Sequence, residues 1–266
     1  KVNHVTALRR GIASKFLGYW EFIFEKKYIA GCSFISTVDP LLAEKLSVLH
    51  HKKSVVVYNG IEEFYPVTVR NEVQKLPLIL CHSGTVYPGH QVEVLLQALH
   101  ELDLEKKITP EDLKLQFVGI EFFPDQLKRI MSYSSAASKY VQTTERLSRS
   151  EASKFNFAAD FLVVFTDSRQ PVIPAKTYEY VSSNRPIVVV LNDHSILAEL
   201  IEGLNAGILL DSLAEVKIFL LEKIQEKKNN QPLFTLSLNK EKALFYTRKM
   251  QTTHFASFLL SQRNSQ

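Results

Sequence analysis

Cysteine is scarce in this sequence, and the motifs in which cysteine carries chemistry are missing. The chain of 266 residues has only two cysteines. Cys32 and Cys81 lie in apolar, strand-like runs without His, Cys, Asp or Glu partners at metal-site spacing, so we expect two buried free thiols, as in a reducing cytosol. The sequence also lacks a phosphate-binding Walker loop and a Gly-x-Ser-x-Gly nucleophile elbow. We therefore expect a cytoplasmic protein that holds no metal ion.

A strong charge of one sign and long apolar runs are missing as well. The formal net charge is +4, without long basic runs, so nothing indicates nucleic acid as a partner. A mild attraction to anionic substrates or membrane surfaces remains open. The longest apolar stretch near the start, residues 16–30, contains Glu21, Glu25, Lys26 and Lys27, so we do not expect it to span a membrane. With 45% hydrophobic and 23% charged residues, the composition is that of a globular protein with one large or two smaller domains.

Residues 161–190 carry the pattern around which the chain is arranged. Residues 161–165 form a continuous apolar run, typical of a strand that is buried on both faces of a parallel sheet. Pro174 is well placed as the first residue of a following helix, and residues 186–190 return as a second buried strand. The segment predicts a βαβ unit, whose helix begins at the carboxyl edge of the sheet, where open α/β sheets bind ligands.

Lys176 and Glu179 are the candidate ligand-binding residues of this helix. They are three positions apart, so both side chains project from one face of its first turns. The free N–H groups of a helix N-terminus attract anions, and a cation beside a carboxylate suits a ligand that carries both phosphate and a diol. An ordinary surface ion pair has the same spacing, and the spacing does not distinguish these alternatives.

Alternating strands and helices continue through the rest of the chain. Strand candidates that alternate with helices over about 140 residues predict a doubly wound, parallel α/β sheet, and residues 240–260 predict a closing helix. The strand candidates are residues 78–81, 115–118, 140–141, 161–165, 187–191 and 207–209.

The first 66 residues predict only part of a domain. The pattern gives helix, strand, helix and strand over residues 11–28, 30–38, 40–49 and 54–58. Two strands do not complete a parallel sheet domain, because both faces and both edges of such a sheet need cover. With Lys1 rather than Met at the start, we expect a truncated chain. The first helix carries Trp20 and other aromatic residues, and it either packs on a sheet or lies on a membrane surface.

One segment resembles that of a known enzyme family. It covers residues 174–188 and reads PAKTYEYVSSNRPIV, similar to a segment of the GT-B nucleotide-sugar glycosyltransferases, especially family 4 (group 1). In that family the matching glutamate accepts hydrogen bonds from the donor's ribose, which implies this role for Glu179. The resemblance implies a Rossmann-like doubly wound donor domain at residues 67–240 and a partial N-terminal Rossmann-like domain at 1–66. It also implies a final helix at 241–266 that packs back toward the N-terminal domain.

Two further segments resemble the donor site of the family. Residues 82–90, HSGTVYPGH, are similar to its first βα turn, and residues 143–147 follow a strand where relatives border the nucleobase. Ser148 and Glu151 have the spacing of a capping box, so we expect Ser148 to be structural. The resemblance implies a donor diphosphate site at Lys176, Gly84, Thr85, His90 and Ala175, and a nucleobase site near Thr144, Arg146 and Leu147.

The sequence departs from the family pattern at two positions. His90 stands where relatives often have Arg, and an imidazole is a weaker and pH-dependent clamp for a diphosphate. Pro171 stands where many members have a glutamate that touches the donor sugar. These departures keep open a degenerate domain that binds a nucleotide or a partner without turnover. A nucleotide-sugar epimerase of the same architecture is the alternative among enzymes.

The resemblance implies a retaining glycosyltransferase that needs no metal or other cofactor. Its donor would be a nucleotide sugar, with a UDP-sugar as the default. Its acceptor would be a glycan or a lipid-linked glycan in surface polysaccharide biosynthesis, in the cytoplasm and with peripheral membrane association open. We expect these 266 residues to be inactive alone.

Overall fold

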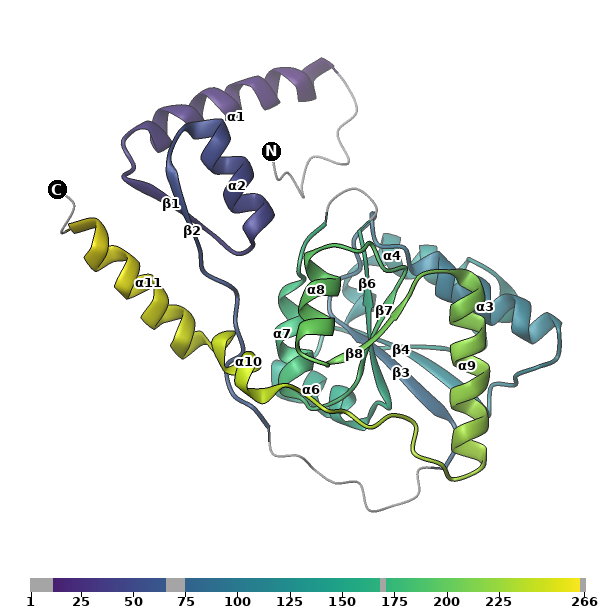
Figure 1. Ribbon diagram of the computed structural model, residues 1–266. Coiled ribbons are helices and arrows are strands. Elements are labelled where there is room, and N and C mark those ends of the chain that lie inside the picture. The colour runs from purple at the N-terminus through teal and green to yellow at the C-terminus, as the bar shows by residue number, and fades with distance from the viewer. Residues whose placement is uncertain (1–11, 66–74, 168–170, 264–266) are drawn as a thin grey trace. The chain divides into compact units, whose positions relative to one another are not determined.

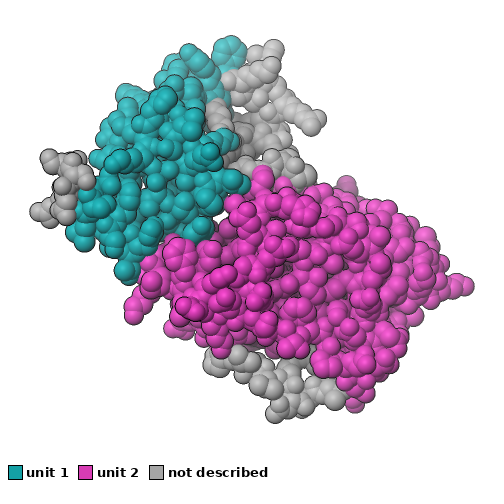
Figure 2. Space-filling model, viewed as in Figure 1, with its two compact units in different colours: residues 1–58, 252–266 teal, residues 59–251 magenta. Residues whose placement is uncertain are grey.

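The computed structural model describes residues 12–65, 75–167 and 171–263. The chain divides into two compact units, which are coloured separately in Figure 2. One unit contains residues 1–58 and 252–266, and the other contains residues 59–251. Each unit is described by itself.

The smaller unit is built around two parallel strands. β1 (Phe34–Thr37) pairs with β2 (Lys53–Val56), and the elements follow in the order α1 (Ile12–Ala30), β1, α2 (Pro40–His50), β2. Asp39 caps α2, because its carboxylate accepts a hydrogen bond from the N–H of Leu42 at 2.7 Å. From the other end of the chain, α11 (Arg248–Arg263) brings Phe258 edge-on to Phe34, with ring centroids 5.1 Å apart.

Cys32 is exposed, and the expectation that it is buried was wrong. The strand expected from residue 30 begins only at Phe34, so Cys32 lies in the turn after α1, where its thiol contacts the carbonyl oxygen of Tyr28 at 3.5 Å. Cys81 is buried as expected, and burial raises the pKa of its thiol to about 12. Within the described residues, no helix is both long and apolar enough to cross a membrane.

The larger unit contains a parallel sheet of six strands in the order β5-β4-β3-β6-β7-β8 (Figure 1). The predicted doubly wound α/β fold is confirmed. β3 lies between β4 and β6, so the strand order changes direction beside it, and open α/β sheets bind ligands outside the carboxyl ends of the strands at such a point. The strands are β3 (Leu78–Ser83), β4 (Leu113–Val118), β5 (Val141–Thr143), β6 (Phe161–Phe165), β7 (Ile187–Val190) and β8 (Gly207–Leu210).

Helices cover both faces of this sheet. α3 and α9 lie on one face, and α6, α7 and α8 lie on the other (Figure 1). All five residues of β6 are buried, which explains why the run is apolar at every position and shows no alternation. The helices are α3 (Val92–Leu104), α4 (Pro124–Met131), α5 (Ser135–Ser138), α6 (Arg149–Ala158), α7 (Ala175–Ser182), α8 (Ile196–Gly203), α9 (Leu213–Lys228) and α10 (Lys240–Phe245), with a short 3-10 helix, η2 (Ile120–Phe122).

A buried ion pair holds α9 to the sheet. Lys227 bonds the carboxylate of Asp160, and their side chains are only 3% and 1% exposed. Lys227 also donates to the carbonyl oxygen of Pro77 at 2.8 Å, while Asp160 accepts from the N–H of Ile79 at 2.7 Å. The pair therefore fastens α9 to the beginning of β3 and to the residue before β6.

The closing segment is two helices, α10 and α11, and the expectation of one helix over residues 240–260 was wrong. The interruption comes from pairing with a distant segment. Ile61 donates its N–H to Tyr246 O at 2.7 Å and accepts from the N–H of Arg248 at 2.8 Å. Gly60 lies beside this contact at φ +73, and a Cβ there would meet the Tyr246 oxygen at 3.1 Å.

Candidate functional site

α7 begins at the carboxyl edge of the sheet, after β6. Its first residue is Ala175, which is exposed. Pro174, expected as the first helical residue, occupies the cap position before it, because its ψ of 136° is extended and not helical. The helix therefore starts one residue later than predicted, with Lys176 in its first turn and Glu179 in its second.

The amine of Lys176 reaches into the loop after β3. Its Nζ lies 2.8 Å from Nε2 of His82 and donates to Thr85 O at 3.1 Å. Because Nδ1 of His82 lies 2.9 Å from Val163 O, a carbonyl that only accepts, the proton of the neutral ring belongs on Nδ1 and Nε2 is left as the acceptor for Lys176. Burial and, next, the Lys176 charge lower the pKa of His82 well below its ordinary value. His82 is therefore uncharged.

Burial lowers the pKa of Lys176 to about 7, and the carboxylate of Glu179 opposes this shift. The residue as a whole is half-buried, and its amine lies between Nε2 of His82 and Thr85 O. Within the described residues, no carboxylate forms an ion pair with this amine. An arriving phosphate would supply the missing counter-charge.

The loop between β3 and α3 surrounds this amine. Gly84 has φ +94, and its N–H donates to Val118 O at 2.8 Å, so in this structure that N–H is occupied. A Cβ on Gly84 would lie 3.7 Å from the Lys176 amine, so the glycine leaves this approach open. His90 is buried, with its ring centroid 6.4 Å from that of His82. The structure therefore brings four of the candidate diphosphate residues together, namely Lys176, Gly84, Thr85 and His90.

Arg129 of α4 holds the same loop in place. Its guanidinium donates to His90 O at 2.7 Å and to Tyr87 O at 3.2 Å, and it pairs with Glu93 of α3 at 2.5 Å. The carboxylate fixes the guanidinium, and the guanidinium fixes two carbonyls of the loop. No sequence pattern indicated that Arg129 of α4 holds the loop between β3 and α3.

Two of the three candidate nucleobase residues contact the segment after β4. The hydroxyl of Thr144 accepts from the N–H of Gly119 at 2.9 Å. The guanidinium of Arg146 lies over the ring of Phe122, 4.9 Å from its centroid. Leu147 is partly buried. Ser148 caps α6 through the full capping box with Glu151, as the spacing predicted.

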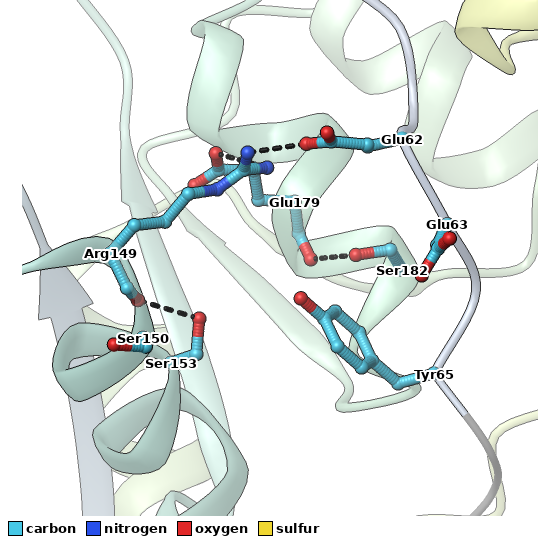
Figure 3. A pocket seen from close by; sticks show the side chains of 8 residues that line it. All are labelled: Glu62, Glu63, Tyr65, Arg149, Ser150, Ser153, Glu179 and Ser182. Atoms are coloured by element: carbon cyan, nitrogen blue, oxygen red, sulfur yellow. Dashed lines mark hydrogen bonds and ion pairs between the residues drawn. The ribbon is translucent and has the colours of Figure 1, made fainter.

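A pocket of about 540 Å³ lies beside α7 (Figure 3). Glu179 lines it, whereas Lys176 does not. The other lining residues come from α6, from the end of α7 and from the segment that precedes residue 66. They are Glu62, Glu63, Tyr65, Arg149, Ser150, Ser153 and Ser182.

Arg149 joins two carboxylates at this pocket. Its Nη1 bonds Glu62, and its Nη2 lies 3.1 Å from Oε1 of Glu179. Arg248, at the start of α11, lies 3.5 Å from Glu62. Hydrogen bonding and charge from Arg149, followed by the charge of Arg248, hold the pKa of Glu62 below its ordinary value. Figure 3 shows the Arg149 side chain extending from α6 toward both carboxylates.

Sequence reasoning missed Arg149, Glu62 and Tyr65. Glu62 and Tyr65 lie at the end of the predicted first domain, residues 1–66, and Arg149 follows the capping serine as an ordinary first helical residue. No spacing rule links them to Glu179. Within the described residues, no group of three or more His, Cys, Asp or Glu side chains is placed to hold a metal ion.

The sequence matches no family model, and no curated protein matches it. Solved structures do match. The pneumococcal O-GlcNAc transferase GtfA in complex with UDP and GlcNAc has a TM-score of 0.59 and 14% identity, over 91% of this chain and 47% of that one. The Anabaena Alr3699/HepE in complex with UDP-glucose has a TM-score of 0.63 and 13% identity, over 93% and 69%.

A glycosyltransferase from Rickettsia africae ESF-5 has a TM-score of 0.62 and 14% identity, over 88% of this chain and 65% of that one. This chain spans about half the length of GtfA. Likeness at such identities shows the fold alone. The chain has the α/β fold of the GT-B glycosyltransferases, with a six-stranded parallel sheet flanked by helices.

Proposed function

We propose that this chain is the donor-binding part of a glycosyltransferase that uses a nucleotide sugar, with a UDP-sugar as the default donor. One observation carries the proposal. Lys176 and Glu179 rise from the first two turns of α7 at the sheet's switch point, with the amine in the loop after β3 and the carboxylate in a pocket. A nucleotide sugar offers a diphosphate to the first and ribose hydroxyls to the second. The printed names of GtfA with UDP and of HepE with UDP-glucose support the same donor class.

We assign each candidate residue to the part of the nucleotide that its charge or position suits. The Lys176 amine, with Thr85, His90 and the N-terminal turn of α7 at Ala175, holds the diphosphate, and Gly84 keeps the approach clear. Glu179 accepts hydrogen bonds from the ribose. The loop of Thr144, Arg146 and Leu147 borders the base.

The reaction we propose is transfer of the sugar, with retention, to a glycan or lipid-linked acceptor in surface polysaccharide biosynthesis. Negative charge develops on the diphosphate as it leaves, and a fixed cation at that position stabilises the transition state more than the ground state. Lys176 supplies this cation, and the proposal assigns no metal ion to the step. The chain would act in the cytoplasm, and the exposed Trp20 of α1 supports contact with the inner membrane surface.

Replacing Glu179 with Gln tests the ribose assignment. We expect the affinity for UDP to fall about tenfold or more, because a hydrogen bond to a charged group is worth about 1.5–3 kcal/mol. The free energy of unfolding should change by less than about 0.5 kcal/mol, since the side chain is 47% exposed. Calorimetric titration with UDP and urea unfolding measure the two quantities.

Glu222→Gln on α9 is the matched control, because it removes one exposed carboxylate outside the pocket. It should leave UDP affinity unchanged. Equal affinity of the parent and Glu179→Gln for UDP would contradict the ribose assignment.

A second expectation concerns turnover. These 266 residues should bind UDP or a UDP-sugar but transfer no sugar, because the described part of the first unit has a sheet of only two strands to offer an acceptor. Alignment of two reactants is worth about 7–11 kcal/mol in favourable cases, and donor binding cannot replace it. The assay follows UDP release from UDP-sugars with a crude lipid-linked acceptor fraction. Sustained release that depends on the acceptor would overturn this expectation.

A further inference from the structure

The candidate ligand-binding side chains near α7 form two sets of opposite charge. At one end the amine of Lys176 is enclosed with the uncharged His82, so that end favours an anion. At the other end three carboxylates and one guanidinium line the pocket, namely Glu62, Glu63, Glu179 and Arg149. An excess of carboxylates repels phosphate and accepts hydrogen bonds from hydroxyl groups. The pocket therefore suits a neutral group rich in hydroxyls.

Glu179 retains its capacity to bind such a group. Among the described residues, Arg149 is its charged partner at 3.1 Å, and neither carboxylate oxygen accepts a hydrogen bond. Its side chain is 47% exposed toward a pocket of about 540 Å³. A hydroxyl of a ligand can thus donate to it without breaking a hydrogen bond inside the protein.

Arg149 is held in place for the same ligand. A guanidinium has five N–H donors, and Glu62 fixes one side of the fork through Nη1. The backbone carbonyl oxygen of Arg149 accepts a hydrogen bond from the hydroxyl of Ser153 at 2.8 Å, one turn further along α6. The rest of the guanidinium faces the pocket, half-exposed beside Glu179.

We propose that Arg149 is a ribose-binding residue and that, with Glu179, it selects ribonucleotides over deoxyribonucleotides. The inference rests on the proposed function. The carboxylate of Glu179 accepts from one hydroxyl of the vicinal diol, and the guanidinium of Arg149 donates to the oxygen of its neighbour. Glu62 is a positioning residue, because it acts on the ligand only through Arg149. Loss of either hydroxyl leaves a charged group of the pair without its ligand contact, which is the basis of strong discrimination between analogues.

The experiment is calorimetric titration of the whole chain with UDP, 2′-deoxy-UDP and 3′-deoxy-UDP at pH 6.5. We expect the parent chain to bind UDP at least tenfold more tightly than the weaker of the two deoxy analogues. Arg149→Gln should weaken UDP binding about tenfold and reduce the preference over one of the two analogues to about twofold or less, while the preference over the other analogue, which depends on Glu179, remains. Arg149→Lys keeps the charge but loses the forked guanidinium, so its affinity for UDP should lie between those of the parent and Arg149→Gln. Glu62→Gln should lower UDP affinity by less than Arg149→Gln.

Lys154→Gln is the matched control, because it removes an exposed positive charge from the same helix outside the pocket. It should preserve both the affinity and the preference. Thermal unfolding verifies that each variant is folded, and a purely structural role for Arg149 would weaken all three nucleotides equally.

An unchanged preference in a folded Arg149→Gln chain would overturn the inference and leave the proposed function intact. The same holds if the parent binds UDP and both deoxy analogues equally. If the parent binds none of UDP, GDP and ADP, the proposed function fails and the inference fails with it.

Discussion

Nucleoside diphosphate affinity should fall as pH rises from 7 to 9, by up to about tenfold per pH unit. The cause is Lys176, whose pKa burial lowers to about 7. The charged amine binds the diphosphate, so the bound state has the higher pKa. Below pH 7 the free protein already carries the proton and the affinity is flat. Above pH 7 binding must take up a proton, and the affinity falls until the pKa of the complex is reached.

The other titratable groups around this amine do not account for such a change. Burial lowers the pKa of His82 well below its ordinary value, so it stays neutral across this range. Burial raises the pKa of Cys81 to about 12, so its thiol stays protonated. His90 is buried in the same loop, with its ring centroid 6.4 Å from that of His82, so its variant serves as the control.

Two variants and one buffer comparison distinguish these groups. His90→Gln should keep the pH dependence, and Lys176→Met should bind UDP at least tenfold more weakly at pH 6.5 and show little dependence on pH. Titration at pH 8 in buffers of different ionisation enthalpy should give an uptake of up to one proton per UDP, which Lys176→Met abolishes. A flat affinity from pH 6 to 9 in the parent, or loss of the dependence in His90→Gln alone, would contradict the assignment to Lys176.

The second large effect concerns stability. Lys227→Met should lower the free energy of unfolding by about 3–5 kcal/mol, because it leaves the charge of Asp160 buried without its counter-ion. Asp160→Asn added to Lys227→Met should recover part of the loss, since the uncharged amide can still accept from the N–H of Ile79. Urea unfolding at pH 7 measures both changes.

Lys240→Met is the control for this experiment, because Lys240 is exposed at the start of α10. It should change stability by less than about 0.5 kcal/mol. A cost below 1 kcal/mol for Lys227→Met would show that the pair contributes little. Equal stability of Lys227→Met with and without Asp160→Asn would show that the uncompensated charge is not the cause.

Local patterns in the sequence determined the elements of the larger unit. The run at 161–165 is apolar at each position because β6 is covered on both faces, and the structure has the strand at those residues. Ser148 and Glu151 set the start of α6 through contacts three residues apart. Helical spacing placed Lys176 and Glu179 in the first two turns of α7, whereas the family resemblance, and not the spacing, marked them as candidate ligand-binding residues.

The tertiary structure decided which groups meet, since contacts between distant segments leave no periodic trace in the sequence. It placed Arg149 between Glu62 and Glu179, and it divided the closing helix where Tyr246 and Arg248 pair with Ile61. It also decided the chemistry of Lys176. A lysine has an ordinary pKa near 10.5, whereas enclosure in the loop after β3 lowers the pKa of Lys176 to about 7, because burial disfavours the charged amine.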